Sequence, residues 1–347
     1  MLVYDFSDAS LPQFVARLNL PSRWPHPTLT GEFLIVVRWP YALVPSWDTG
    51  FYVVDIMDLA SPIVVSATNL PQTGRSVSLL GDLAFVGGGN VTGRVVDISI
   101  VETPQVVGSL PPFPAGLYST QIVGAYMYAA SGRVFVVDLT DPIQPVIVDT
   151  ALEVGSCFDF AIQGHRLHAV DVYPTFGLEG MGCFDISNPV ATGFLGSLSN
   201  GGGDVSIAVQ NDRAYVVNGS GGLYAVDISD PSNPTPVICY RTGTAASCSV
   251  TVGVDYYGVT LFDRFAFIGG NNAGLLAFEL DPRGDVSADG TVSSSDIISL
   301  VNFVFKSGPP PASPTQSDTN CSQDLTASDV IILVNYVFKG TNVPVCP

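Results

Sequence analysis

Short apolar runs recur along most of the chain, and each run ends in an acidic residue. The clearest copy is 222–231, where the apolar stretch Leu-Tyr-Ala-Val is followed by Asp-Ile-Ser-Asp-Pro. The acids that end the seven related runs are Asp5, Asp55, Asp97, Asp138, Asp185, Asp227 and Glu279. The closest neighbours are 41 residues apart (Asp97 to Asp138) and the most distant 52 (Asp227 to Glu279). This spacing indicates a repeated structural unit.

Each unit contains four short apolar runs. Around 222–231 they are 204–209, 213–217, 222–227 and 236–240, each bounded by turn-forming residues and most of them rich in Val, Ile or Tyr, which is typical of strands. The third run is apolar at consecutive positions, so both of its faces must be covered. Four strands in about forty residues, packed on both sides, match a propeller blade better than a leucine-rich or helical repeat. We therefore predict an all-β propeller over residues 1–281.

The number of blades depends on the two ends of this region. Residues 1–20 supply only a third and a fourth strand, and the last unit lacks a fourth strand. Pairing of the strand 12–18 with the last unit would close six blades, whereas two further strands before Met1 would give seven. We favour six, because a ring closed by its own ends leaves no unpaired strand edge.

The recurring acids are interpreted as turn formers. In Asp-Ile-Ser-Asp-Pro, short Asp and Ser side chains can bond to nearby backbone N–H groups, and Pro fixes φ. We expect Asp97, Asp138, Asp185 and Asp227 to hold turns rather than to perform chemistry.

These residues resemble the bacterial LVIVD-repeat family, which is named for an apolar run ending in Asp. The best copies are 135–142 (Phe-Val-Val-Asp-Leu-Thr-Asp-Pro) and 224–231 (Tyr-Ala-Val-Asp-Ile-Ser-Asp-Pro). The resemblance covers residues 1 to 281 and implies a propeller that is secreted or displayed at the cell surface, with an unassigned ligand.

The pattern changes after residue 281. Residues 285–296 fit a twelve-residue calcium loop, with Gly290 at the sharp turn and Asp rather than Glu at the last position. An apolar stripe at helical spacing follows, from Ile297 to Phe305. After a Pro-rich linker the unit repeats 33 residues on, as Asp285 and Asp318 show. The predicted ligands of one or two calcium ions are Asp285, Ser287, Asp289, Thr291, Ser293, Asp296, Asp318, Asn320, Ser322, Asp324, Thr326 and Asp329.

This duplicated loop–helix arrangement resembles a type I dockerin over residues 284–340. We expect a small all-α calcium-binding domain at 282–347, with units 285–306 and 318–339. The resemblance implies calcium-dependent binding to a cohesin-like domain through loop positions 10 and 11. Those positions are Ser294, Ser295, Ala327 and Ser328. The second loop departs from the family at Ser322 and Gln323, where Asp and Gly are usual, and Val301 and Asn302 replace basic residues.

The net charge and the cysteines limit the classes of partner and the cellular compartments that we expect. With 13 basic and 31 acidic residues the net charge is −18, which disfavours nucleic-acid binding. No apolar run is long enough to span a bilayer. Closeness in sequence suggests the disulfides Cys321–Cys346, Cys239–Cys248 and Cys157–Cys183, hence an oxidising compartment. No signal peptide is visible, so we expect the true start to lie upstream and the protein to be secreted or on the surface of a bacterium.

The propeller offers few residues for chemistry. Two long loops between second and third strands, 38–48 and 171–179, break the repeat and would present aromatic side chains to a sugar or a peptide. Their candidate residues are Arg38, Trp39, Tyr41, Trp47, Tyr173 and Phe176. No nucleophile elbow or phosphate-binding loop is present, and Asp159 is the one acid noted in a first strand. We therefore favour a non-catalytic interaction protein over the alternative, a glycoside hydrolase or polysaccharide lyase carried on a dockerin.

Overall fold

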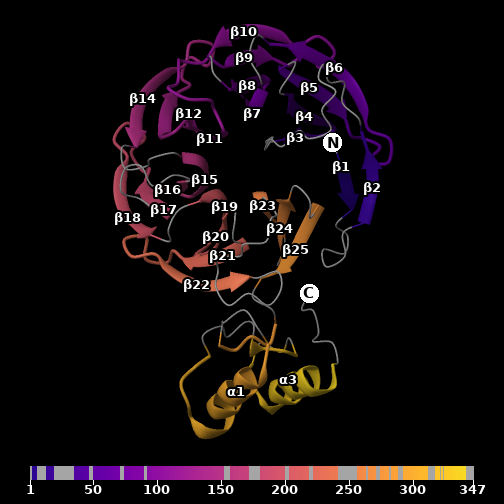
Figure 1. The fold of residues 1–347 in the computed structure, drawn as a ribbon, viewed down its shortest axis with the longest axis vertical. Helices are drawn as coiled ribbons and strands as arrows, with labels where there is room; N and C mark the ends of the chain where they lie inside the picture. Colours follow the sequence, from indigo (N-terminus) through magenta and orange to yellow (C-terminus); the bar gives the residue numbers. More distant parts are fainter. Residues whose placement is uncertain are drawn as a thin grey trace.

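A computed structural model shows a six-bladed all-β propeller and two C-terminal helices (Figure 1). The structure describes residues 2–5, 13–18, 35–46, 50–70, 74–89, 92–151, 157–171, 180–199, 203–218, 222–240, 256–262, 265–270, 274–280, 283–287, 292–311, 317–320, 322 and 324–340. The expectation of six blades is confirmed. No helix in these residues is long and apolar enough to cross a membrane.

Each blade is an antiparallel sheet whose strands follow in sequence order from the centre of the ring to its rim (Figure 1). The first three blades are β3 (Val36–Arg38), β4 (Tyr41–Ser46), β5 (Gly50–Asp55) and β6 (Ile63–Asn69); β7 (Gly74–Leu80), β8 (Leu83–Gly88), β9 (Arg94–Asp97) and β10 (Gln105–Ser109); and β11 (Ser119–Val123), β12 (Tyr126–Ala130), β13 (Val134–Asp138) and β14 (Val146–Ala151). The other three are β15 (Cys157–Gln163), β16 (Arg166–Asp171), β17 (Gly180–Asp185) and β18 (Gly193–Ser199); β19 (Asp204–Gln210), β20 (Arg213–Asn218), β21 (Gly222–Asp227) and β22 (Thr235–Tyr240); and β23 (Tyr256–Phe262), β24 (Phe265–Gly270) and β25 (Gly274–Glu279).

The hydrophobic core lies between the blades. The third strands β5 and β17 are buried at every position except the terminal Asp. Five apolar clusters join neighbouring blades, as where Phe85 of β8 packs with Met127 of β12 and Phe135 of β13. Coverage of both faces of the third strand, predicted from its consecutive apolar residues, is therefore confirmed.

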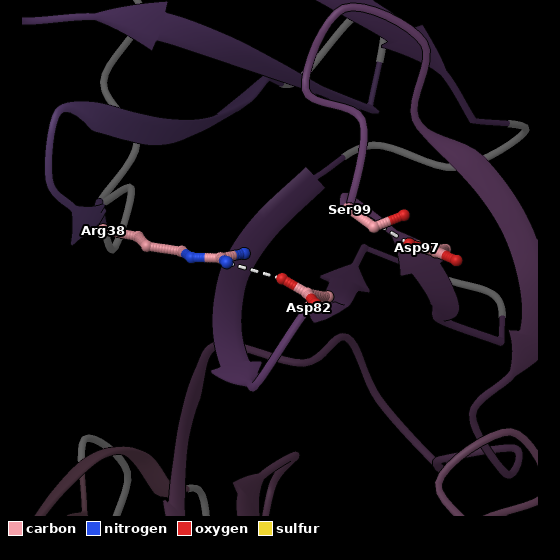
Figure 2. Close-up of polar contacts among 4 residues, drawn as sticks. All are labelled: Arg38, Asp82, Asp97 and Ser99. Atoms are coloured by element: carbon pink, nitrogen blue, oxygen red, sulfur yellow. Dashed lines mark hydrogen bonds and ion pairs between the residues drawn. The ribbon is translucent and has the colours of Figure 1, made fainter.

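The acids that end the third strands hold the turns that follow. Asp138 Oδ1 accepts the N–H of Thr140 at 2.7 Å, and Asp97 accepts that of Ser99 at 2.8 Å (Figure 2). The matching bonds in the other blades are Met57 N to Asp55, Ser187 N to Asp185 and Ser229 N to Asp227, each 2.8 Å. The hydrogen bond from Ser99 lowers the pKa of Asp97. We call segments 55–62, 97–104, 138–145, 185–192 and 227–234 the acidic turns.

The N-terminal strands do not complete the last blade. β2 (Gln13–Arg17) pairs with β1 (Leu2–Asp5) in a separate two-stranded sheet, and β25 pairs with β24. Leu18, next to β2, packs against the β3–β6 blade. The predicted pairing of residues 12–18 with the last unit is therefore wrong: among the described strands β2 pairs with its neighbour in sequence, β1, and the last sheet contains only β23, β24 and β25.

Two short helices form the described C-terminal structure. They are α1 (Ser294–Lys306) and α3 (Ala327–Lys339), which lie outside the ring and pack together around Leu300 and Leu333 (Figure 1).

The acidic turns give a test of the turn assignment. Asp138→Ala removes the acceptor of the Thr140 N–H and should lower the free energy of unfolding by about 1 kcal/mol. Asp138→Asn keeps an oxygen acceptor and should retain most of the stability. Thermal denaturation of both variants measures this, and equal stability of the Ala variant and the parent would contradict the role.

Candidate functional site

The first C-terminal loop brings its two ends together around a buried carboxylate. Asp296, at loop position 12, is fully buried, and Asp285, at position 1, is 1% exposed. Ser287, at position 3, donates to Asp296 Oδ1 from its N–H (2.9 Å) and its hydroxyl (2.8 Å). The same hydroxyl lies 3.3 Å from Asp285 Oδ1. Positions 1, 3 and 12 therefore converge.

The second loop repeats this arrangement. Asp329 is fully buried, and its Oδ1 accepts the N–H of Asn320 at 3.1 Å. Ser322 N donates to both Asp318 Oδ1 and Asn320 Oδ1, each at 3.0 Å. Asp318, Asn320 and Asp329 thus occupy the places of Asp285, Ser287 and Asp296.

The last carboxylate of each loop also starts the following helix. Ser293 is the N-cap of α1, and its N–H donates to Asp296 Oδ2 at 2.9 Å. Thr326 is the N-cap of α3, and its N–H donates to Asp329 Oδ2 at 2.8 Å. Both ends are capping boxes, which fix the loop to the helix axis.

The described oxygens suit a hard divalent cation. Each loop presents carboxylate, hydroxyl or amide oxygens near one buried carboxylate, and calcium binds six to eight such oxygens. Asp289 and Thr291, two of the predicted ligands, lie outside the described residues. Within the residues that the structure describes, no group of three or more His, Cys, Asp or Glu side chains has the geometry of a metal site. The assignment of the two loops as cation sites therefore rests on their matching hydrogen bonds.

The helices expose apolar side chains at equivalent positions. Ile298 and Ile331 are 61% and 60% exposed, and Phe305 and Phe338 are 60% and 69% exposed. Ile298 and Phe305 belong to the apolar stripe seen in the sequence, yet they are exposed, whereas Leu300 of the same stripe is buried in the cluster between the helices. The predicted contact residues Ser294, Ser295, Ala327 and Ser328 are all exposed. Comparison of the two repeats pairs these positions in the sequence, whereas their exposure follows from how the helices pack.

The stretch 38–48 is not a long loop between the second and third strands. Arg38 ends β3, Trp39 and Pro40 form a tight turn with a cis peptide bond, and Tyr41 begins β4. The error arose because the second strand contains Pro45 and was read as irregular. Trp39 is 64% exposed, whereas Tyr41 packs on the core. Trp47, Tyr173 and Phe176 lie outside the described residues.

Arg38 forms an ion pair rather than an open ligand contact. Its Nη2 lies 2.5 Å from Asp82 Oδ1, in the first hairpin of the next blade (Figure 2). Both side chains are about half exposed, so the pair adds only about 0–1 kcal/mol to stability.

Asp159 joins three blades. Its Oδ2 accepts from Ser206 Oγ at 2.7 Å and from Ile207 N at 3.1 Å, both on β19, and Ser119 of β11 also bonds to it. Burial raises the pKa of the Asp159 carboxyl, against the effect of these donors. Because the donors already surround the carboxylate, its geometry supports a structural link between the innermost strands.

An aromatic stack on the innermost strands was missed by sequence analysis. Arg75 lies over the ring of Tyr118 at 4.9 Å, and the Tyr118 and Phe158 ring centres are 4.3 Å apart. All three side chains are partly exposed and come from three adjacent blades. Each stands five residues before the end of its first strand, so alignment of those strands would have found them.

The predicted disulfide Cys157–Cys183 is wrong. Cys157 lies on β15 and Cys183 on β17, separated by β16 and therefore by about 10 Å across the sheet, whereas bridged Cα atoms lie within about 7 Å. Cys157 packs with Val136 of the preceding blade, while Cys183 packs with Ile207 of the following blade. Both are thiols. Cys248, Cys321 and Cys346 lie outside the described residues, as does the side chain of Cys239.

Cys183 contacts a buried histidine instead. His168 is fully buried, and its Nδ1 lies 3.2 Å from Cys183 Sγ. Burial lowers the pKa of His168 to about 4 and raises the pKa of Cys183 to about 12. Both side chains of the pair are therefore neutral at pH 7. Matching positions in other blades carry Phe85, Tyr128 or Phe267.

His168 should make the propeller sensitive to acid. Because its pKa is about 4 in the folded state and 6.5 when unfolded, the unfolded chain binds more protons between these values. Stability is therefore full above pH 6.5 and falls by about 3 kcal/mol as the pH drops to 4. Chemical denaturation across this range measures the slope.

A matched pair of variants isolates this effect. His168→Phe, which restores the aromatic residue of other blades, should remove that part of the pH dependence, whereas His165→Asn at an exposed turn should leave it unchanged. An identical pH profile for His168→Phe and the parent would contradict the assignment.

Comparisons with known proteins agree with this architecture. The LVIVD repeat family matches residues 35–69 and 201–242, which contain the β3–β6 and β19–β22 blades. A comparison with curated proteins finds no match. Among solved structures, the crystal structure of the computationally designed Ika8 protein is similar, with a TM-score of 0.52, 12% identity and coverage of 75% of this chain and 72% of that chain. At this identity the likeness shows the fold alone. The chain therefore carries LVIVD repeats on a six-bladed β-propeller.

Proposed function

We propose that this is a non-catalytic interaction protein, secreted or held at a bacterial cell surface. Its propeller binds a protein or carbohydrate partner, and residues 282–347 form a dockerin-like module that binds calcium and docks onto a cohesin-like domain. Disulfide Cys321–Cys346 would secure the second helix in an oxidising compartment.

The observation that carries the proposal is the match between the two C-terminal loops. In each loop a fully buried Asp accepts the N–H of position 3 with one oxygen and the N–H of the helix N-cap with the other. An Asp at position 1 lies at the start of each loop. Such a duplicated arrangement has no counterpart in the propeller repeat, so a separate function explains it better than the fold does.

A bound calcium ion would compensate the negative charge of these buried carboxylates. Burial of ionised carboxylates is costly unless charge or hydrogen bonds compensate. Asp285 and Asp296, with Asp318 and Asp329 in the second loop, would hold the ion together with the hydroxyl and amide oxygens between them. The apolar cluster under both loops is small, with Val286, Leu300, Val330 and Leu333 buried. A metal would therefore add substantially to the stability of this part of the chain.

Docking would use the exposed faces of the helices. Ser294 and Ser295 at the start of α1 and Ala327 and Ser328 at the start of α3 are exposed, as are Ile298 and Ile331 one turn further along. Exposed apolar side chains bordered by small polar ones are typical of protein interfaces. A cohesin-like domain is the partner that the sequence resemblance implies.

No observation favours the enzymatic alternative. Asp159, the candidate acid noted in the sequence, is engaged by Ser119, Ser206 and Ile207 in a link between blades. Glycoside hydrolysis requires a second carboxyl group within reach of the first, and none is placed beside Asp159 by the contacts of the described residues.

Calcium titration tests the metal assignment. Asp296→Asn and Asp329→Asn each replace a ligand oxygen by an amide, and each should weaken one calcium site by about tenfold or more. Isothermal titration calorimetry of the full chain should show two sites in the parent and one strong site in each variant. Asp212→Asn in an exposed propeller hairpin is the control and should bind like the parent.

The Asp296→Asn and Asp329→Asn variants alter the helix caps as well as the calcium sites. Chelation with EDTA removes only the metal and therefore distinguishes the two effects. EDTA should reduce the helical circular dichroism of the parent and leave the strand signal of the propeller unchanged, and added calcium should restore the helices. A helical circular dichroism signal that stays unchanged in EDTA would contradict the calcium proposal.

Docking is tested with a purified cohesin domain. Binding should require calcium and should weaken by about tenfold on combining Ser294→Asp with Ala327→Asp, since both introduce charge into the exposed surface. Asp141→Asn on the propeller should have no effect. Absence of calcium-dependent binding to a panel of cohesin domains would contradict the docking role.

A further inference from the structure

An arc of large apolar side chains is exposed along the outer edge of four consecutive blades. From each blade we take one residue of the acidic turn and one at the start of the outermost strand; Leu59 and Val107 are exposed beside them. We call these eight residues the rim arc: Met57, Ile63, Ile100, Val106, Ile143, Val146, Val190 and Phe194. Their exposed fractions run from 43% for Ile143 to 67% for Met57. The strands that carry them, β6, β10, β14 and β18, form the perimeter of the ring (Figure 1).

Contacts between blades make the arc continuous. Four acidic turns, 97–104, 138–145, 185–192 and 227–234, rest on the outermost strand of the preceding blade. Ser66 on β6 donates to the Val101 carbonyl at 2.6 Å, and Thr192 N donates to Asp149 on β14 at 2.6 Å. Gly108 on β10 lies against the Ile143 backbone, where a Cβ would collide with the carbonyl. Turn residues and strand residues therefore alternate around the rim.

The fold accounts only in part for these exposed residues. Phe194 packs against buried Phe184, with ring centres 5.6 Å apart, yet it remains 45% exposed. On β6, Val64 packs into the core beside exposed Ile63, and on β14, Ile147 does so beside Val146. The inward positions thus supply the packing, while the outward positions leave apolar area in water. Exposed apolar area that recurs from blade to blade indicates an interaction surface.

The arc is bordered by negative charge. Segments 55–63, 97–106, 138–146 and 185–194 contain no Lys, Arg or His. Their acids are Asp55, Asp58, Asp97, Glu102, Asp138, Asp141 and Asp185. Two basic side chains, His165 and Arg166, lie near Asp185 on this border. This field repels anionic lipid, nucleic acid and a second copy of the same surface, and it attracts a basic partner.

We propose that the rim arc is the docking surface for a protein partner that presents basic and apolar side chains together. Apolar contacts with the arc would supply affinity, and basic residues would meet the acidic turns at its border. The inference rests on the proposed interaction role of the propeller and gives that role a location and a partner chemistry. It involves no residue of the calcium loops.

Two peptide probes separate apolar contact from charge attraction. One is an amphipathic helix built only from Lys and Leu, and the other is an all-Lys peptide of the same charge. Fluorescence anisotropy with the full chain should show that the Lys/Leu peptide binds at least about tenfold more tightly.

Near-isosteric variants locate the binding surface. Ile63→Thr, Val106→Thr and Val146→Thr combined keep the net charge and the strand propensity. The triple substitution should lower the affinity for the Lys/Leu peptide by about tenfold and the affinity for the all-Lys peptide by less than about twofold. The control is Val37→Thr with Val123→Thr, two exposed residues on first strands, which should change neither affinity.

Three outcomes would overturn the proposal. If the triple variant bound the Lys/Leu peptide as tightly as the parent, the binding would not depend on the rim arc and would reflect nonspecific electrostatic attraction. Binding of the parent to phosphatidylglycerol vesicles, lost in the triple variant, would assign the arc to a membrane. A dimer in sedimentation that the triple variant dissociates would assign it to a second copy. Calcium-dependent docking is measured independently, so its failure and the failure of the rim arc are distinguishable.

Discussion

A short carboxylate that accepts backbone N–H groups is the interaction on which both parts of this chain depend. In the propeller, Asp55, Asp97, Asp138, Asp185 and Asp227 each close the turn after a third strand. In the C-terminal loops, Asp296 and Asp329 bond to the loop and to the helix N-cap at once. The acidic composition is therefore partly structural, because Asp reaches backbone donors two or three residues away that a longer side chain reaches less directly.

Turn geometry also sets how the blades fit together. Because the acidic turn is held in one conformation, it rests on the outermost strand of the preceding blade, at positions such as Gly108 and Gly196, where backbone approaches backbone. The residue after the turn acid bonds to the first hairpin of its own blade, as Leu139 N does to the Ala125 carbonyl at 2.8 Å. Each turn thus couples the inner hairpin, the outer strand and the next blade, while the apolar clusters between blades provide most of the burial.

Positions that depart from the repeat divide into two kinds. Asp159 and the His168–Cys183 pair replace apolar or small residues inside the ring, and their contacts are internal. The rim arc and the exposed apolar residues of α1 and α3 leave much of their apolar surface in solvent. A protein with two such surfaces, one on a rigid ring and one on a small module, is suited to hold two partners together.

The repeat, the propeller fold and the turn role of the acids followed from the sequence alone, because a period near forty and consecutive apolar residues are consequences of local strand geometry. The number of blades did not, since it depends on how the two ends of the ring pair. The duplicated loops and helices were likewise visible in the order of oxygen side chains and apolar residues. The sequence did not decide where β2 pairs, that Tyr41 lies in a strand, or that Cys157 and Cys183 face different blades. It also did not reveal which apolar side chains remain exposed along the rim and on the helices. These outcomes depend on which faces the neighbouring blades and helices cover, and only packing in three dimensions determines that.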